Sequence, residues 1–507
     1  MKKISIVLLV IIVLIITITY IIYNIYIRID IKKSNNESKV TKEKIISKDL
    51  RIGITNFDTV NPIISENTNV QNISRLIYEP LLNLTYDYKL EECLATEWKK
   101  IDENSYIIKL RRNVKWQDGK EFDADDVVYT VNIINELKDK SIYYNNVYNI
   151  KQIKKIDKHT IKIYTFEERP YFEYNLIFPI LSSKKQNKNT PVGTGMYYIE
   201  EINKQNINLE SNSNWWNNND IKINNINIKF YKNINEEIED IELNKLDLIA
   251  TSAKDVNEFI DSSKCNIKKY IGRNYNYIVI NCDNKLLKNK KLRQAINYGI
   301  NKNEIIEKVY KNNYVKSEFP LDYGCYLYKR GDEDNYSREK ALKILKDNKI
   351  KNITIDLLVN KNQEDKIKVA SLIKEQLNDI GIKINTIEKS DKKFEQALES
   401  KKYELAIIDN MYELSPDINK YFEKNNLSNY DNNQAIRILK KIESNSEEEA
   451  KKNIEIIKEY YNKDIPFISL YYDTCNFIYS RNLRGKISPN SYNIFYNIED
   501  WYREYDK

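Results

Sequence analysis

Few residues of this sequence are of a type and spacing that could do chemistry. The 507 residues include one histidine, His159, so metal sites built on several imidazoles are excluded and a Ser-His-Asp triad would have to use this residue. His159 directly precedes an alternating segment, and we expect it in an exposed turn. The sequence contains no G-x-S-x-G nucleophile elbow and no Walker A loop. It therefore gives no positive support for an enzyme or an ATPase.

The cysteines give no sign of a metal site or a redox pair. The five of them are scattered without a C-x-x-C pair, at Cys93, Cys265, Cys282, Cys325 and Cys475. An odd, widely spaced set argues against a disulfide framework. We interpret them as ordinary small apolar residues, and we predict no bound metal and no cofactor.

One glycine-rich segment invites a nucleotide-binding interpretation and fails it. Val192-Gly-Thr-Gly-Met contains G-x-G but lacks the third glycine, and it precedes a strand-like run rather than opening a helix, as a dinucleotide fingerprint would. We predict a tight turn with positive φ angles. Acidic residues are numerous, but carboxylates at unknown separation do not define a glycosidase.

Composition indicates a large folded protein without a nucleic-acid partner. The chain has a net charge of +7, 31% charged residues and 41% hydrophobic residues. Its charges are mixed in sign, unlike the concentrated basic stripe of a nucleic-acid binder. The length corresponds to about three average domains, and the apolar content is sufficient for sizeable cores.

The N-terminus predicts a membrane anchor. Two lysines precede an uncharged apolar run from Ile4 to Ile27, which as a helix would be about 36 Å long, against a hydrocarbon core of about 30 Å. The run ends in Tyr20-Ile-Ile-Tyr rather than in the small residues of a cleavage site. A buried core helix is disfavoured because the run has no polar face. We predict an uncleaved transmembrane signal anchor in residues 1–30, a flexible polar tether in residues 31–48, and the large domain on the extracellular face.

The elements that follow the tether are short strands that alternate with helices. Strand patterns with a period of two and helical segments with capping residues recur along the chain; the predicted strands include Ser105–Leu110, Thr160–Phe166, Tyr277–Asn281, Ile353–Val359, Ile382–Ile387 and Phe467–Tyr472, and the predicted helices begin at or after Asp123, Lys290, Lys302, Ser337 and Asn433. Trp116-Gln-Asp-Gly is expected to close a hairpin, and Gly381 to end a helix. The sequence predicts a mixed α/β protein.

Several motifs, taken in order, resemble one family, the peptide- and nickel-binding receptors of ABC importers (solute-binding protein family 5). The motifs are Gly53-Ile-Thr-Asn-Phe-Asp-Thr-Val-Asn-Pro, Ile77-Tyr-Glu-Pro-Leu-Leu, Leu94-Ala-Thr-Glu-Trp, the run from Tyr106 to Thr130, Pro191-Val-Gly-Thr-Gly-Met-Tyr, Asn214-Trp-Trp, Arg293-Gln-Ala-Ile-Asn-Tyr-Gly-Ile, Glu339-Lys-Ala-Leu-Lys-Ile-Leu and Ile465-Pro-Phe-Ile-Ser-Leu-Tyr-Tyr. Any one of them is weak evidence, whereas their common order over residues 50–485 is specific.

The resemblance implies a two-lobed, periplasmic-binding-protein-like (type II) α/β fold with a small inserted domain, preceded by one transmembrane helix. One discontinuous lobe would combine residues 49–80, 190–270 and 470–507. The insert would cover residues 81–189, and the second lobe residues 271–469. Closure of the two lobes around a ligand would be a rigid-body motion about the connecting strands.

The function that the resemblance implies is that of the membrane-anchored, monomeric substrate-binding component of an ABC importer. It would capture oligo- or dipeptides in the cleft and deliver them to the permease and ATPase subunits. One alternative is a tethered receptor or interaction protein that keeps the fold but does not take part in transport; the absence of any cysteine before Cys93 that could carry a lipid favours it. Another is a receptor for nickel or a different small solute, which the single imidazole disfavours.

The ligand-binding residues are implied by the resemblance alone. Peptide receptors of the family add the ligand to exposed strands and pair its amino group with an acid that follows the strand matching Tyr403–Ile408. In this chain Glu413 stands where that acid is expected, Asn410 stands where the family has tryptophan, and Asp417 is the second candidate. The full expected set is Asn410, Met411, Tyr412, Glu413, Asp417, Glu66, Asn67, Thr68, Tyr472 and Asp473.

Overall fold

The computed structural model describes most of the chain, in two compact units. The described residues are 17–25, 27–28, 44–184, 191–217, 220–253, 256, 260–261, 263–321, 324–328, 335–443 and 446–506. The larger unit spans residues 48–503, and the smaller one combines residues 1–47 and 504–507.

The smaller unit contains a helical segment at residues 17–25 with exposed side chains and strand β1 (Lys44–Ser47), which pairs with β20 (Tyr502–Asp506). Within the described parts of the chain, no helix is both long enough and apolar enough to span a membrane. Most of the predicted anchor and tether, residues 1–16 and 29–43, lies outside the described residues.

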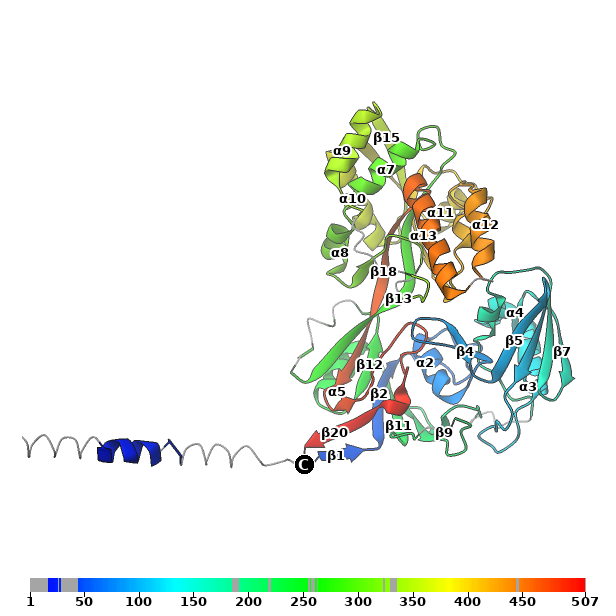
Figure 1. Cartoon of the computed structure of the whole chain (residues 1–507), viewed down its shortest axis with the longest axis vertical. Helices are drawn as coiled ribbons and strands as arrows, with labels where there is room; N and C mark the ends of the chain where they lie inside the picture. Colours follow the sequence, from blue (N-terminus) through cyan, green and yellow to red (C-terminus); the bar gives the residue numbers. More distant parts are fainter. Residues whose placement is uncertain are drawn as a thin grey trace, which may run out of the picture. The chain divides into compact units, whose positions relative to one another are not determined.

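A mixed sheet of eleven strands runs through the larger unit (Figure 1). Its strand order is β16-β15-β17-β13-β18-β12-β2-β11-β10-β9, with β14 paired to β18. The bounds are β2 (Asp49–Thr55), β9 (Tyr197–Ile202), β10 (Asn206–Ser211), β11 (Asn225–Tyr231), β12 (Leu248–Thr251), β13 (Cys265–Ile280), β14 (Tyr314–Lys316), β15 (Ile353–Asn360), β16 (Ile382–Lys389), β17 (Leu405–Met411) and β18 (Phe467–Ser480).

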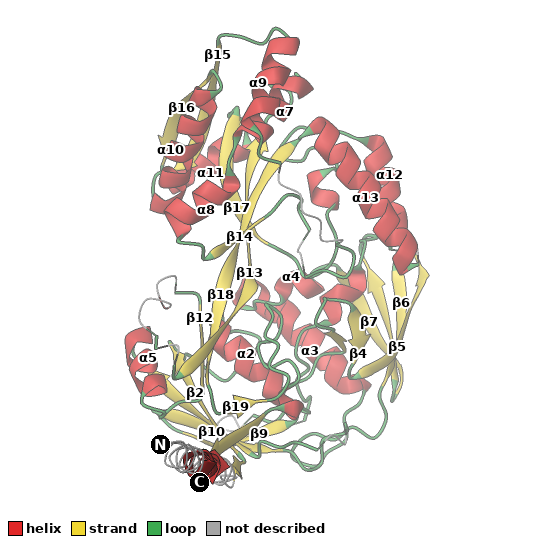
Figure 2. Cartoon of the chain, turned by 60° about the vertical axis from the view of Figure 1, so that its left-hand side comes forward, coloured by secondary structure: helices red, strands yellow, loops and turns green. Residues whose placement is uncertain are grey.

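Strands β13 and β18 connect the two ends of this sheet (Figure 2). They pair antiparallel from Cys265 opposite Ser480 to Val279 opposite Phe467, with register shifts between Ile271 and Tyr275 and between Asn276 and Tyr277. The sequence predicted only the apolar portion of each strand. Polar residues interrupt the alternation in the remaining part of each strand, such as Lys268 and Lys269 in β13 and Asp473 and Asn476 in β18. The end of β18 nevertheless contributes Phe477 and Ile478 to the buried cores, so burial and pairing with neighbouring strands together place it in the sheet.

Helices cover the part of the sheet formed by β13–β18. Their bounds are α7 (Lys290–Gly299), α8 (Lys302–Tyr310), α9 (Arg338–Asp347), α10 (Glu364–Asp379), α11 (Asp391–Glu399), α12 (Asn433–Ile442) and α13 (Glu447–Asp464), with the short η3 (Asn419–Tyr421) after β17. Ser337 accepts a hydrogen bond from the Lys340 N–H at the start of α9, and Gly381 follows α10 with φ +86°. Both predictions are confirmed.

A second sheet has the order β5-β6-β8-β7 and lies between α2 and β9 in the sequence. Its strands are β5 (Ala95–Asp102), β6 (Ser105–Leu110), β7 (Ile150–Asp157) and β8 (Thr160–Thr165). The same part of the sequence holds a separate two-stranded sheet of β3 (Leu82–Leu84) and β4 (Leu90–Glu92), together with α3 (Ala124–Leu137), η1 (Lys138–Lys140), α4 (Tyr144–Val147) and η2 (Phe172–Leu176). The remaining elements are α2 (Thr68–Ile77), α5 (Ile234–Glu242), β19 (Leu483–Arg484) and η4 (Ile498–Asp500).

Buried apolar side chains form separate clusters. The largest draws most of its residues from 275–472. A second lies within residues 63–180, and a third combines residues 50–78, 197–248 and 477–501. The first of these cores therefore belongs to the helix-covered part of the sheet, whereas the third belongs to the strands at the opposite end.

The Gly-Thr-Gly segment corrects one prediction. Neither Gly193 nor Gly195 has a positive φ angle. Glycine is required there because a Cβ on Gly193 would lie 1.7 Å from the Ile77 carbonyl oxygen, and one on Gly195 would lie 2.7 Å from the Leu76 carbonyl oxygen. The glycines thus permit close backbone packing against α2 rather than a left-handed turn.

The predicted turns and cysteines are confirmed. Trp116-Gln-Asp-Gly closes a hairpin, with Gly119 at φ +83° and the Trp116 N–H donating to the Lys120 carbonyl at 2.8 Å. His159 lies in the predicted turn, but the expectation that it is exposed is wrong, because its side chain is half-buried and its Nδ1 is buried. All five cysteines are free, and four of them are buried.

Candidate ligand-binding site

The structure brings together five of the ten predicted ligand residues where three strands lie side by side. Asn410 on β17 is opposite Tyr275 on β13, which in turn is opposite Tyr472 on β18. Met411 on β17 and Asp473 on β18 come next along their strands, and both lie beside Asn274 of β13. We call Arg273–Asn276, Asn410–Tyr412 and Tyr472–Asp473 the three-strand row.

Tyr412 is held at the end of the row by the backbone of β13. Its N–H donates to the Arg273 carbonyl at 2.6 Å, and its own carbonyl accepts from Nε of Arg273 at 3.0 Å. The tyrosine ring is buried and lies edge-on to Tyr472, with ring centroids 5.8 Å apart. Met411, by contrast, is 70% exposed. The row therefore has a fixed backbone and an accessible edge.

Two amide oxygens in the row have no hydrogen-bond partner among the described residues. The side-chain oxygens Oδ1 of Asn274 and Asn410 are buried and accept no hydrogen bond from the described residues. A buried acceptor without a donor costs roughly 1–3 kcal/mol. Asp473 is better satisfied, because it accepts from the Asn274 N–H at 2.8 Å. Burial raises the pKa of its carboxyl group.

Two arginines from distant parts of the sequence lie near the row. The Arg75 guanidinium on α2 lies 3.7 Å from the centroid of the Tyr492 ring. Burial, and after it the positive charge of Arg75, lower the pKa of Arg273. Burial raises the pKa of Tyr143, while the charges of Arg75 and Arg273 both act to lower it. Two positive charges therefore share one half-buried environment.

The two predicted acids differ in their availability. Glu413 is exposed, and its carboxylate forms a loose ion pair with Lys420 at 3.6 Å. Asp417 is half-buried and already accepts from the backbone N–H and the side-chain Nδ2 of Asn419, at 2.8 and 2.7 Å. Burial raises the pKa of the Asp417 carboxyl group. Of the two, Glu413 has the freer carboxylate.

The predicted loop residues Glu66, Asn67 and Thr68 begin helix α2. The Asn67 side chain caps this helix by accepting from the Asn69 N–H at 2.8 Å. Glu66 and Thr68 are exposed. Among the described residues, the hydrogen bonds of the Asn67 side chain all join it to neighbouring parts of residues 55–69. The structure thus gives Asn67 a local structural role and leaves the two flanking side chains accessible.

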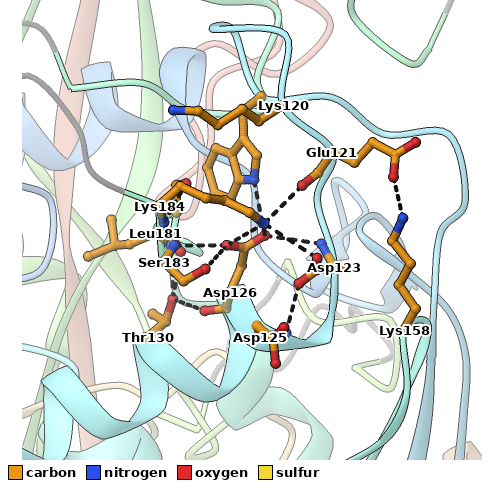
Figure 3. Close-up of polar contacts among 12 residues, drawn as sticks. Lys120, Glu121, Asp123, Asp125, Asp126, Thr130, Lys158, Leu181, Ser183 and Lys184 are labelled. Atoms are coloured by element: carbon orange, nitrogen blue, oxygen red, sulfur yellow. Dashed lines mark hydrogen bonds and ion pairs between the residues drawn. The ribbon is translucent and has the colours of Figure 1, made fainter.

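Two buried acids elsewhere are fully engaged in the fold. Asp126 accepts hydrogen bonds from Trp116, Ser183 and Lys184 and from the Asp123 N–H, at 2.7–3.1 Å (Figure 3). Glu79 accepts from the indole N–H groups of Trp215 and Trp216 at 2.8–3.0 Å. Both acids come from motifs that carry the family resemblance, and both act in packing.

An open groove of ≈ 700 Å³ lies at the ends of β2 and β11. Phe57 and Phe230 stack in it, with centroids 4.3 Å apart, and Lys204 and Lys232 border it. None of the predicted ligand residues lines this groove.

Sequence reasoning missed Arg75, Arg273, Tyr143 and Tyr492. Arg273 precedes the strand predicted from Tyr277, and it joins the row only because β13 extends back to Cys265. Arg75 lies in the Asn-Ile-Ser-Arg turn of α2, where an arginine is usually a solvated side chain. The sequence signal that could have pointed to Arg75 is an arginine in the helix that directly precedes the Tyr-Glu-Pro motif.

The sequence of the chain places it in a known family. The family model described as bacterial extracellular solute-binding proteins, family 5 (middle region) matches residues 89–433. The chain belongs to this family. It has the mixed α/β, periplasmic-binding-protein-like fold of solute-binding receptors, and it is not an enzyme.

Individual relatives are distant but match over most of their length. The chain is 23% identical to the oligopeptide-binding protein AppA of Bacillus subtilis, over 90% of this chain and 91% of the relative. Among solved structures, a putative peptide-binding protein AppA from Clostridium difficile matches with a TM-score of 0.71 and 23% identity, over 90% of this chain and 100% of the other. NikZ from Campylobacter jejuni, in complex with Ni(L-His), matches with a TM-score of 0.60 and 22% identity, over the same shares.

Proposed function

We propose that this chain is the substrate-binding component of an ABC importer and that it captures short peptides with a free amino terminus at the three-strand row. The family membership supports the receptor role, and the oligopeptide-binding relative supports the ligand class. The observation that carries the proposal is that Oδ1 of Asn274 and Oδ1 of Asn410 are buried and have no hydrogen-bond partner among the described residues. Buried polar atoms normally have such a partner, and a bound peptide would supply one.

The row offers the two kinds of contact that a peptide needs. Its strand backbone can hydrogen-bond an extended ligand irrespective of side chains. Glu413 lies one residue beyond Tyr412 and keeps an accessible carboxylate, so it can pair with the ligand's ammonium group. Asp417 is the second candidate, and Asn410, Met411 and Tyr412 would flank the peptide together with Tyr472 and Asp473. Glu66 and Thr68 would contact it from α2.

We assign the lobes as residues 49–80, 190–270 and 470–507 for the first and 271–469 for the second, with residues 81–189 as the insert. The separation of the buried clusters supports this division. In this proposal the lobes close about β13 and β18, the strands that join the two ends of the sheet.

Residues 4–27 would anchor the protein in the cell membrane and hold the monomeric binding domain outside. The apolar, uncharged run in the sequence supports this anchor. Loaded receptor would then diffuse in the membrane plane and deliver its peptide to the permease and ATPase subunits.

The proposal is tested by identifying the small molecules that co-purify with the protein. The full chain is purified in detergent and denatured, and the released small molecules are identified by mass spectrometry. Short peptides with unmodified amino termini are expected. A single non-peptide solute, released in an amount equal to the protein, would contradict the proposal.

A further inference from the structure

The insert is hydrogen-bonded to the first lobe. The Gln117 side chain donates to the Tyr197 carbonyl at 2.6 Å and accepts from the Gly193 N–H at 2.7 Å. The Ser141 hydroxyl donates to the Ile63 carbonyl at 2.7 Å. Because these groups are buried or half-buried, we expect the insert to move with the first lobe.

The insert also packs against the second lobe, through side chains that are not part of its own core. Leu84, Tyr88, Tyr171 and Tyr174 are at most 9% exposed, and they belong to the buried cluster of the second lobe. The separate cluster of the insert does not include them. These four side chains therefore join the insert to the second lobe by a contact that neither β13 nor β18 provides.

Hydrogen bonds from the backbone cross the same contact. The Tyr326 N–H donates to the Asp87 carbonyl at 2.8 Å. The Glu443 carboxylate, just after α12, accepts from the Tyr171 N–H at 3.0 Å. Tyr326 and Glu443 both belong to the second lobe, so two of its segments hold the insert by hydrogen bonds.

Two of the tyrosines have a strained backbone. Among the described non-glycine residues with positive φ angles, only Tyr88 (φ +64°), Tyr171 (φ +55°) and Ile465 are neither asparagine nor lysine. A left-handed backbone is unfavourable for a bulky side chain and persists only where the surroundings hold it in place. For Tyr88 and Tyr171 those surroundings include the second lobe, and such strain is common at clamps and switches.

The contact lies away from the strands that join the lobes. In Figures 1 and 2 the start of α13 lies over the insert, whereas β13 and β18 cross between the lobes at a different place. Rotation of the lobes about these strands would therefore change the separation across the contact. A close-packed interface cannot stretch, so it is either made or broken.

We propose that Tyr88 and Tyr171 form a latch between the insert and the second lobe. The latch holds the lobes in the arrangement of this structure, and it must open before they can rotate about β13 and β18. Glu443 acts as a positioning residue, because its carboxylate fixes the strained backbone of Tyr171. A ligand that favours a different arrangement would bind more weakly by the fraction of molecules that stay latched. The inference rests on the proposed division into lobes and is independent of the nature of the ligand.

The test measures the distance between the lobes by pulsed electron spin resonance on the full chain in detergent. Spin labels are attached at Glu200→Cys on β9 and Lys374→Cys on α10, which are exposed positions in the first and second lobes. Every protein also carries Cys475→Ser, since the other native cysteines are buried. The protein with the latch intact should show one distance, with any second distance below about 10% of the molecules.

Tyr88→Asn and Tyr171→Asn open the latch, because asparagine adopts the left-handed backbone but lacks the ring. Combined, they should raise a second distance to at least about half of the molecules. The matched control is Tyr430→Asn, which removes a buried ring from the same cluster, where its hydroxyl donates to Asp464 of the second lobe. It should lower the melting temperature and leave the distance unchanged.

A finer comparison uses the two lysines that pair with Glu447, each at 2.7 Å. Lys89 reaches Glu447 from the insert, whereas Lys451 lies on α13 itself. In the Tyr88→Asn protein, where both distances are expected to be populated, Lys89→Ala should raise the second population roughly twofold. Lys451→Ala should leave it unchanged.

The outcomes are distinct. A single unchanged distance in the double variant, with circular dichroism showing a folded protein, would overturn the latch. Equal changes in the double variant and in Tyr430→Asn would also overturn it, because a general loss of packing would then explain both. Should the double variant fail to fold, Tyr171→Asn alone and the lysine pair decide in the same way. A failure of peptide binding would not affect this measurement, since it uses no ligand.

Discussion

The Asp126 network and the three-strand row both bury polar side chains, but they satisfy them differently. Around Asp126, each carboxylate oxygen accepts at least two hydrogen bonds (Figure 3). In the row, Oδ1 of Asn274 and of Asn410 accept none from the described residues.

If the proposed function holds, the difference separates polar groups that stabilise the fold from polar groups that a ligand would satisfy. A saturated buried network stabilises one conformation, and any further partner would have to displace an existing one. Unsaturated groups cost stability in the unliganded protein, and a ligand that supplies their partners recovers that free energy. The comparison predicts that substitutions in the first region change stability and those in the second change binding.

The largest effect is expected at Asp126. Asp126→Ala removes the acceptor of several donors in a fully buried position and should lower the free energy of unfolding by about 3–5 kcal/mol, measured by urea unfolding. Asp125→Ala, next to it and exposed, breaks only the ion pair with Lys155 and should cost less than about 1 kcal/mol. Similar losses for the two variants would contradict the assignment of Asp126 as the centre of the network.

Glu79 lies between these two cases. Its carboxyl group accepts hydrogen bonds from two tryptophans, but burial makes its ionisation unfavourable. Burial raises its pKa from 4.5 to about 7, against the opposing effect of the Trp215 and Trp216 hydrogen bonds. The folded state therefore keeps a proton that the unfolded chain releases. The stability of wild type relative to Glu79→Gln should fall by about 3 kcal/mol as the pH rises from 4.5 to about 7. Urea unfolding of both proteins across this range measures it; parallel curves would show that the carboxyl group ionises normally.

A smaller effect, on binding alone, is expected at Glu413. A charge-assisted bond between Glu413 and the peptide ammonium group is worth about 1.5–3 kcal/mol, so Glu413→Gln should weaken binding at least about tenfold without changing the melting temperature. N-acetylation of the peptide should do similar damage, and the two changes together should cost less than their sum. Asp417→Asn tests the second candidate, and it should change the affinity little, because Asn419 already occupies that carboxylate. Purely additive losses would mean that Glu413 does not meet the ammonium group.

The smallest effect is expected from removing the anchor. Deletion of residues 1–33 should release a soluble protein with the melting temperature and peptide affinity of the full chain, because these residues lie outside the unit of residues 48–503. The comparison uses scanning calorimetry on both proteins, with the full chain in detergent. Aggregation of the shortened chain would show that the apolar run belongs to the fold.

Elements with an apolar face or a cap were predictable from the sequence. Ser337, Asp123 and Gly381 marked helix ends correctly, since caps act through adjacent backbone groups. The first half of β13 and the second half of β18 were not, because their polar residues are placed by pairing between strands that are far apart in the sequence. The close approach at Gly193 was equally hidden, since it depends on the position of α2.

The candidate site was predictable only where the resemblance carried it. Asn410 to Glu413 follow a recognisable strand, and five of the ten expected residues meet in the row. The lack of a hydrogen-bond partner at Oδ1 of Asn274 and Oδ1 of Asn410, among the described residues, was not predictable, because it is a property of the folded chain. A sequence shows which groups are polar, but not which of them remain without a partner.

The most direct measurement is a crystal structure of the protein with the best-binding alanine peptide. The account predicts that the peptide lies along the three-strand row, with its ammonium group on Glu413 and a donor within hydrogen-bond distance of Oδ1 of Asn410. A peptide bound in the groove of Phe57 and Phe230, with the row unchanged, would contradict it.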